Sequence, residues 1–407
     1  MPDDVLAPAA LNRALLARQH LLARAPGTQG TQGTQGTPGA AEAMVAHLVG
    51  MQAQNPRSPY VALWSRLEGF SADDLSRRVE DRSVSRIACL RGTIHLVTRQ
   101  DAVVLPALTL PVQLAQLRAN AEHGAVLRSL DLSLLAAVAR DLVEEEPRTP
   151  VELGLAMASR WPGVAPAALA LAARGTLPLV QVTPRGLWRR SGATRWTTVR
   201  AWLGAEEEPV DQEGQAAALE SLTLRYLAAF GPASVADLQR WCGLTGLGPV
   251  VERLRDRLVV FRAEQTAAGR RGRELFDLPD APRPDASTPA PVRLLADFDN
   301  LTLSHADRTR VVSDAHRRRL ASPNGVAPGP VLIDGRVAGT WAVSSGRAAG
   351  AHRTDASAPV RAALVVTPLE PLTAAQTDAV RSEAEAMVCF VADDATEHRV
   401  EVLAAAP

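Results

Sequence analysis

The chain has 407 residues, 46% of them hydrophobic and 22% charged, and a formal net charge of zero. This composition is typical of a soluble globular protein with roughly two to four domains. Zero net charge excludes a strongly basic coat that binds nucleic acid nonspecifically, but it is compatible with a local arginine-lined groove.

Lysine is absent, so all 44 basic residues are arginine, as is typical of a GC-rich genome. No side chain can therefore form a Schiff base or bind pyridoxal phosphate. The three cysteines, Cys89, Cys242 and Cys389, lie far apart and form no C-x-x-C motif, which excludes the usual zinc sites and a disulfide framework. We expect neither a metal nor an organic cofactor.

The N-terminal segment MPDDVLAPAALNR lacks the basic and then apolar pattern of a secretion signal. No uninterrupted apolar stretch reaches the length that a membrane span needs. We expect a cytoplasmic protein that associates with the nucleoid and not with a membrane.

In chain order, apolar residues at helical spacing predict helices over residues 11–24 and 40–54. Between them, residues 27–39 read GTQGTQGTQGTPG, a composition typical of a flexible linker. Ser71, three residues before Asp74, marks the start of another helix.

Two short apolar runs over residues 85–97 are joined by Arg91-Gly92, which predicts a β-hairpin. The same order of helix, helix and hairpin recurs over residues 149–190, where the hairpin is LPLVQVTPRGLWRR. It recurs again over residues 231–278. Helix-turn-helix units with β-wings have this order, and three copies indicate an internal repeat.

Residues 278–292 are rich in proline, aspartate and alanine and indicate a domain boundary. Short strands with Asp-Gly turn chemistry follow, and one helix over about residues 373–390 lies among them. This pattern favours a small β-rich domain that resembles a partly closed barrel.

We therefore predict an α+β fold of three tandem winged helix-turn-helix units followed by a small C-terminal β-barrel-like domain. The expected units are residues 1–130, which carry the motif discussed next, and then 131–215, 216–285 and 286–407.

One polar residue interrupts the apolar face of the predicted helix 40–54. Val45 and Leu48 define its buried stripe, and Gln52 falls on the same stripe by helical spacing. A buried amide without partners costs about 1–3 kcal/mol. The protein, water or a ligand must therefore satisfy Gln52.

Gln54 follows two residues later and on an ideal helix would point away from Gln52. Pro56 disfavours helical backbone at Asn55, so the last turn is expected to unwind. In an extended segment both amides then share one face. The alternative is a frayed helix end whose polar side chains meet water.

Five segments in this order resemble a bacterial family of winged-helix DNA glycosylases that act on interstrand crosslinks and bulky alkyl adducts. The segments are MQAQNPRSPYVALWSRLEGF, RIACLRGTIHLVT, GPASVADLQRWCGL, LLADFDNLTLSHADR and VLIDGRVAGTW. The most similar branch is the AlkZ-like one, which protects antibiotic producers from their own DNA-alkylating compounds. The resemblance covers about residues 10–405 and implies three winged helices and a C-terminal barrel. The Thr-Gln-Gly repeat departs from the family.

The catalytic motif of that family is glutamine, an apolar residue and glutamine, which Gln52-Ala53-Gln54 matches. A related branch has aspartate at the last position. The resemblance implies hydrolysis of the N-glycosidic bond of N7-alkylguanine in double-stranded DNA. N7-alkylation makes the base cationic, so an amide that accepts a hydrogen bond from water and faces the developing charge is a sufficient catalyst by hypothesis. Without lysine we expect no lyase activity.

Basic and polar residues near these segments are candidate DNA contacts, although several also fit a structural or solvated role. They are Asn55, Arg57, Arg91, His95, Arg185, Arg189, Arg190, Arg317 and Arg318. The DFDN segment with His305 and Asp307 contains groups that can bind metals, but its spacing matches no familiar ligand set.

The function that we expect is that of a monofunctional DNA glycosylase, acting as a monomer. A non-catalytic winged-helix DNA-binding protein or regulator is the alternative, and a protein-interaction scaffold is a remoter one. Three tandem units with an amide pair fit a regulator poorly.

Overall fold

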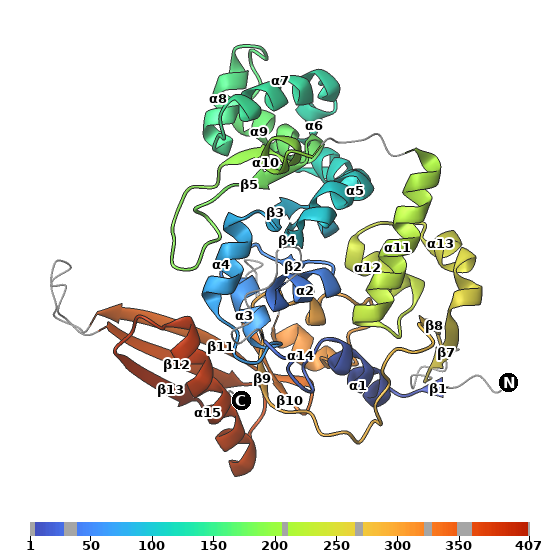
Figure 1. Ribbon diagram of the computed structural model, residues 1–407, viewed down its shortest axis with the longest axis vertical. Coiled ribbons are helices and arrows are strands. Elements are labelled where there is room, and N and C mark those ends of the chain that lie inside the picture. The colour runs from blue at the N-terminus through green and yellow to red at the C-terminus, as the bar shows by residue number, and fades with distance from the viewer. Residues whose placement is uncertain are drawn as a thin grey trace.

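The computed structural model describes residues 5–27, 39–205, 211–264, 272–320, 328–347 and 360–405. Helices and sheets are mixed in an α+β fold with three separate sheets (Figure 1). The α+β prediction is therefore confirmed. Residues 28–38, which hold most of the Thr-Gln-Gly repeat, lie outside the described residues.

The central sheet has five strands in the order β2-β4-β3-β5-β6. The strands are β2 Met51–Gln52, β3 Val84–Ala88, β4 Ile94–Thr98, β5 Leu179–Gln181 and β6 Trp196–Thr198. Strands β3 and β4 pair antiparallel on either side of Arg91-Gly92, which confirms the first predicted hairpin. The helices nearby are α1 Pro8–Arg18, α2 Ala40–His47, α3 Ser58–Trp64 and α4 Ala72–Glu80. Ser71 caps α4 by accepting a hydrogen bond from the Asp73 N–H, as its sequence position predicts.

The predicted helix 40–54 is too long, because α2 ends at His47. Val49 and Gly50 follow with φ of 53° and 93°, so the backbone leaves the helical region there. The next residues pair with β4 instead, Met51 opposite Leu96 and Gln52 opposite His95. The apolar pattern continued past the helix because Met51 is also buried, but on a strand.

The second predicted hairpin is only half right. Strand β5 forms where expected, but its partner is Trp196–Thr198 and not the GLWRR segment. Trp188 in that segment instead stacks on Phe390, at 5.2 Å between ring centroids, and contacts Tyr60. Because β3 also pairs with β5, the central sheet crosses the expected boundary at residue 130.

A mostly helical region is inserted between β4 and β6 and lies at the top of Figure 1. Its helices are α5 Arg99–Ala119, α6 Gly124–Leu127, α7 Leu132–Glu145, α8 Pro150–Ala158 and α9 Pro166–Thr176. It has a hydrophobic core of its own, which includes Leu135, Leu153 and Leu169. By length and composition α5 is apolar enough to cross a membrane, but it contains Pro106 and Pro111.

The third region begins with α10 Val199–Leu203 and α11 Gln212–Phe230, followed by α12 Val235–Cys242, α13 Gly248–Arg253 and the 3₁₀ turn η2 Arg255–Arg257. Strands β7 Val259–Ala263 and β8 Glu274–Asp277 pair antiparallel, as predicted. Strand β1 Val5–Leu6 adds to β7 in parallel. The N-terminal end of the chain thus contributes to the third sheet.

The C-terminal region is β-rich, as predicted. Its strands are β9 Arg293–Leu294, β10 Gly329–Ile333, β11 Arg336–Arg347, β12 Val360–Pro368 and β13 Glu397–Val402. They form one sheet in linear order with β13 and β9 at its edges, so the described strands make an open sheet and no closed barrel. The Asp334-Gly335 turn has positive φ at both residues, which fits the predicted Asp-Gly chemistry. The remaining elements are η3 Asn300–Thr302, α14 Asp314–Arg319 and α15 Ala374–Val391.

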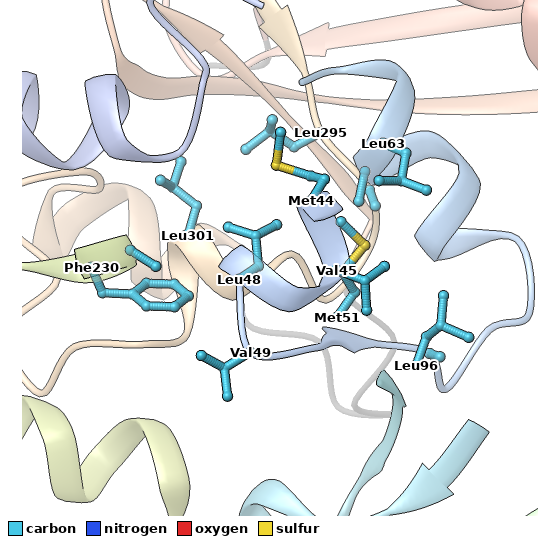
Figure 2. Close-up of a cluster of buried hydrophobic side chains, with 14 of the residues drawn as sticks. Met44, Val45, Leu48, Val49, Met51, Leu63, Leu96, Phe230, Leu295 and Leu301 are labelled. Atoms are coloured by element: carbon cyan, nitrogen blue, oxygen red, sulfur yellow. The ribbon is translucent and has the colours of Figure 1, made fainter. Parts of the chain in front are cut away.

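The main hydrophobic core joins the first, third and C-terminal regions. Figure 2 shows Val45, Leu48 and Val49 of the α2 segment together with Phe230 from α11 and Leu301 from η3. Apolar burial of this extent is the main stabilising term in a folded domain. It also fixes the position of β2, which directly follows α2.

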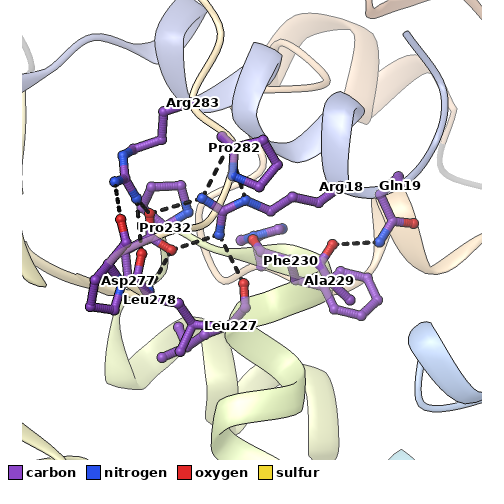
Figure 3. A network of polar contacts seen from close by, with 12 residues as sticks. Arg18, Gln19, Leu227, Ala229, Phe230, Pro232, Asp277, Leu278, Pro282 and Arg283 are labelled. Carbon is purple, nitrogen blue, oxygen red and sulfur yellow. Dashed lines mark hydrogen bonds and ion pairs between the residues drawn. The ribbon is translucent and has the colours of Figure 1, made fainter. Parts of the chain in front are cut away.

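A buried ionic network fastens α1 to the third region (Figure 3). Arg18 donates to both carboxylate oxygens of Asp277, at 2.6 and 2.8 Å, and to the Leu227 carbonyl at 2.9 Å. Arg283 pairs with the same aspartate. Every charge of this network therefore has an opposite charge beside it.

Candidate active site

The Gln52-Ala53-Gln54 segment lies at the edge of the central sheet and is held by its main chain. The Ala53 N–H donates to the Ile94 carbonyl at 2.8 Å, which continues the pairing of β2 with β4. Arg86 of β3 donates to the Ala53 carbonyl at 2.7 Å. The chain is therefore extended at Gln52 and Ala53, and Gln54 follows in a bend. Both glutamines lie beside β4 because of strand pairing and not because a helix unwinds.

Both glutamine amides are tied to the β3–β4 hairpin through their oxygens. Gln52 is buried, and its Oε1 accepts a hydrogen bond of 2.8 Å from Arg91 Nη2. Gln54 is exposed, and its Oε1 lies 3.4 Å from the Ile94 N–H. A guanidinium can only donate, so the Gln52 atom that faces it must be the oxygen. Gln52 Nε2 has no hydrogen bond within the described residues.

Arg91 is turned into the protein. Its Nη1 donates to the Trp241 carbonyl at 2.6 Å, and its Nη2 donates to Asn300 Oδ1 at 2.9 Å in addition to Gln52. Burial lowers its pKa to about 10. Its guanidinium is therefore used by protein acceptors in this structure, and its predicted role as a DNA contact stays a prediction.

His95 is fully buried and supports Arg91. Burial, followed by the charge of Arg91, lowers the His95 pKa to about 3, so the imidazole is neutral. Its Nε2 lies 3.4 Å from Arg91 Nη2 and must accept there, while Nδ1 lies 3.2 Å from the Thr93 carbonyl and must donate. A side chain with no exposed surface cannot contact DNA, so this predicted contact is corrected to a structural role.

Asn55 and Arg57 are exposed beside the amide pair. Asn55 Oδ1 accepts from the Arg57 N–H at 3.0 Å, and its Nδ2 donates to Asp297 Oδ2 at 3.1 Å. Ser58 Oγ donates to the other oxygen of Asp297. The sequence predicted Asn55 and Arg57 as functional residues beside the motif, but it did not predict that Asp297 lies there.

The predicted contacts in the β5–β6 loop have protein surroundings of their own. Arg185 lies near Arg86, the residue that binds the Ala53 carbonyl, and its charge lowers the Arg86 pKa after burial does. Arg189 pairs with both Asp393 and Asp394, so a DNA phosphate would have to displace two carboxylates. Arg185 is half-buried and donates to the Gly192 carbonyl at 3.2 Å. Arg190 is exposed.

A second group of arginines lies close to Arg91 and includes two that the sequence analysis did not select. Burial is the main cause of the lowered Arg91 pKa, and the charges of Arg240 and Arg308 lower it further. Burial also lowers the Arg308 pKa most, and the charges of Arg240 and Arg317 add to that effect. Within the described part of the chain, neither Arg240 nor Arg308 has a side-chain hydrogen bond or ion pair. Arg317 is exposed and pairs with Asp314 at 3.0 Å, while Arg318 is exposed.

The acidic and histidine residues after β9 have structural partners. Asp299 forms a buried pair with Arg66 at 2.8 Å, and His305 lies 3.0 Å from the Phe230 carbonyl. Asp307 pairs with Arg273. These partners occupy Asp299, His305 and Asp307, whereas Asp297 of the DFDN segment binds only the neutral donors Asn55 and Ser58.

Sequence reasoning missed Arg86, Arg240, Asp297, Asn300 and Arg308 as members of this region. The last three lie within the ADFDNLTLSHADR segment, whose likeness to the family was the available signal. No local pattern places that segment beside β2, because its contacts are with residues more than two hundred positions earlier.

Similarity to known proteins identifies the family. The family model for the AlkZ-like DNA glycosylases matches residues 45–390. An interstrand DNA cross-link repair glycosylase of Streptomyces sahachiroi is 26% identical over 329 residues, covering 74% of this chain and 82% of that protein. The solved structure of the Streptomyces sahachiroi DNA glycosylase AlkZ shares the fold, with a TM-score of 0.70, 20% identity, and coverage of 98% of this chain and 100% of that chain. The family predicted from the sequence is therefore confirmed, and the chain belongs to the AlkZ-like DNA glycosylase family.

Proposed function

We propose that this protein is a monofunctional glycosylase that hydrolyses the N-glycosidic bond of bulky or crosslinking N7-alkylguanine adducts in double-stranded DNA. The observation that carries the proposal is the pair of amides, Gln52 and Gln54, whose oxygens are both held by the β3–β4 hairpin at a sheet edge. The name of the Streptomyces sahachiroi relative, a cross-link repair glycosylase, supports the substrate class.

Excision of an N7-alkylated guanine does not require a general acid. Alkylation at N7 leaves the guanine cationic, so the base departs neutral without first being protonated. The remaining work is to place a water below the sugar and to stabilise positive charge as it develops. Gln52 Oε1 already accepts from Arg91, and so we assign its free Nε2 to the water, which accepts one hydrogen bond and keeps a lone pair for C1′.

The absence of lysine supports hydrolysis over β-elimination through a Schiff base. The product is then an abasic site, and the strand breaks only after treatment with alkali.

Duplex DNA would lie across the three segments that each combine two helices with an antiparallel strand pair, which we interpret as winged-helix units. The pairs are α3 and α4 with β3–β4, α8 and α9 with β5–β6, and α12 and α13 with β7–β8. The unpartnered Arg240 and Arg308, with exposed Arg57 and Arg317, supply positive charge for phosphates near the amide pair. A monomer suffices for this arrangement.

We place the protein in the cytoplasm, associated with the nucleoid, where it would protect its host against a DNA-alkylating natural product. An open site at a sheet edge suits adducts too bulky to be flipped into a closed pocket.

A duplex with one nitrogen-mustard N7-guanine adduct tests the proposal. The alkali-dependent strand break measures excision under single-turnover conditions, and a binding assay at two salt concentrations measures affinity. We expect Gln52→Ala/Gln54→Ala to lose about 10²–10³-fold in rate and to retain affinity. Arg240→Ala/Arg308→Ala is the matched contrast. It should keep the rate at saturating protein, bind more weakly, and lower the salt slope by about one per arginine.

Excision by the glutamine double variant at the parental rate would contradict the assigned chemistry. Binding of the adduct duplex without any excision by the parental protein would favour the non-catalytic DNA-binding alternative.

A further inference from the structure

A carboxylate belongs to the amide site although it lies far from it in sequence. Asp297 follows β9 and is half-buried against the residues that come directly after Gln54. Asn55 Nδ2 donates to its Oδ2 at 3.1 Å, and Ser58 Oγ donates to its Oδ1. Two donors from opposite ends of one short turn fix the orientation of this carboxylate.

Asp297 differs from its neighbour Asp299 in its partners. Asp299 is buried and bonded through both oxygens to Arg66, at 2.8 Å each, so its charge is neutralised. No arginine pairs with Asp297 among the described residues, and both of its donors are neutral. Each carboxylate oxygen can accept a further hydrogen bond, so Asp297 keeps acceptor capacity that Asp299 has used.

Gln52 and Asp297 line the same small cavity, together with Arg66, Asp299 and Asn300. Its volume is about 10 Å³, which is close to the size that holds a single water molecule when polar partners surround it. The cavity therefore has both the Gln52 side chain and a carboxylate without a counter-ion in its lining.

We infer that Asp297 is a catalytic residue which, together with Gln52, holds the attacking water, accepts its proton and faces the developing sugar cation. This inference rests on the proposed glycosylase function. It supplies what the amides lack, because the oxygens of Gln52 and Gln54 are directed to the hairpin and no amide carries negative charge.

The step balances without a cofactor. The bond from C1′ to N9 breaks, and its electron pair leaves with the N7-alkylguanine, which becomes neutral. The water oxygen forms the new bond to C1′, and its proton passes to the Asp297 carboxylate. The protonated aspartate then releases that proton to solvent.

The test compares four proteins on the nitrogen-mustard adduct duplex under single-turnover conditions. Asp297→Asn should lower the rate by about 100-fold or more, within the range of general-base catalysis, with unchanged DNA affinity. Asp297→Glu should retain part of the activity. Asp297→Asn/Gln54→Asp returns a carboxylate to the same turn and should recover part of the lost rate, which no purely structural role of Asp297 would allow. Asp378→Asn, the same change on the exposed face of α15, should behave as the parent.

The pH dependence of the rate gives a second readout. It should differ between the parent and any residual activity of Asp297→Asn, because an asparagine amide cannot take up the proton of the water. If Asp297→Asn does not fold, Ser58→Ala decides. It removes the donor to Asp297 Oδ1 and should lower the rate, and a parental rate in that variant overturns the inference.

A parental rate in Asp297→Asn overturns the role of Asp297 and leaves the glutamine mechanism standing, provided that Gln52→Ala/Gln54→Ala is slow. If the parental protein does not excise the adduct at all, the proposed function itself fails, and the inference fails with it.

Discussion

The ionic network between α1 and β8 and the candidate active site differ in the partners of their charged groups. In the first, Arg18 and Arg283 share Asp277, so cation and anion lie together (Figure 3). In the second, Arg91 contacts only neutral acceptors and Asp297 only neutral donors.

The comparison indicates that paired charges stabilise the fold, whereas charges without an opposite partner are available to bind a substrate. A buried ion pair offsets much of its own desolvation, and loss of one partner leaves the other unpaired. An unpaired charge costs stability in the free protein and is retained where an incoming group can complete it. DNA brings both signs, since its phosphates are anionic and an N7-alkylated base is cationic.

The largest effect is expected in the paired network. Asp277→Ala leaves Arg18 and Arg283 without their carboxylate and should lower the free energy of unfolding by about 3–5 kcal/mol. Urea unfolding measures this change. The single-turnover rate of the folded fraction should remain near that of the parent, and a change in stability below about 1 kcal/mol would show that the network is not stabilising.

Arg91→Met should act mainly on the rate. It removes the donor that orients the Gln52 amide, and a misplacement of about 1 Å at a reacting group costs up to about 100-fold. Single-turnover kinetics should show a lower maximal rate with little change in affinity. Weaker binding with a smaller salt slope and an unchanged rate would instead restore the sequence-based prediction that Arg91 contacts phosphate.

The smallest effect concerns His95 and pH. Its pKa is lowered from 6.5 to about 3 by burial and then by Arg91. The unfolded chain therefore takes up a proton below pH 6.5 that the folded protein refuses, so stability is lost as the pH falls, by about 1.4 kcal/mol per unit.

His95→Asn should lack this contribution. Urea unfolding near neutrality and one unit below pH 6.5 compares the two proteins. The pKa of His305 is also lowered to about 3, so His305 adds the same pH dependence of stability to the parent and to the variant. Its contribution therefore cancels in the comparison. Equal pH dependence in parent and variant would show that His95 is not a buried neutral group.

Much of the site was predictable because some of its signals are local. The two short apolar runs on either side of Arg91-Gly92 predicted the β3–β4 hairpin, and that hairpin supplies the partners of both amides. A departure from the helix at Gln52 and Gln54 was also predicted, although as an unwound helix end. Their place on a strand could not be predicted, because a two-residue strand has no periodicity of its own and exists only by pairing with β4.

The orientation of the Arg91 side chain could not be predicted either, and the reason is a different one. Hairpin-turn residues are usually exposed, and so Arg91 was expected to contact DNA. Its guanidinium instead points into the protein, where it donates to the carbonyl of Trp241 and to the side-chain oxygen of Asn300. Both acceptors come from other regions of the fold, and local sequence carries no information about them.

The sequence by itself determined the α+β class, most helices and strands, the family and the pair of glutamines, because turn chemistry, apolar spacing and short motifs act over a few residues. Tertiary structure decided where α2 ends, which arginines keep a free charge and which carboxylate joins the amides. Asn55 and Asp297 are 242 positions apart, and only packing of the C-terminal region against the central sheet brings them within a hydrogen bond. The proposed catalytic carboxylate follows from that contact.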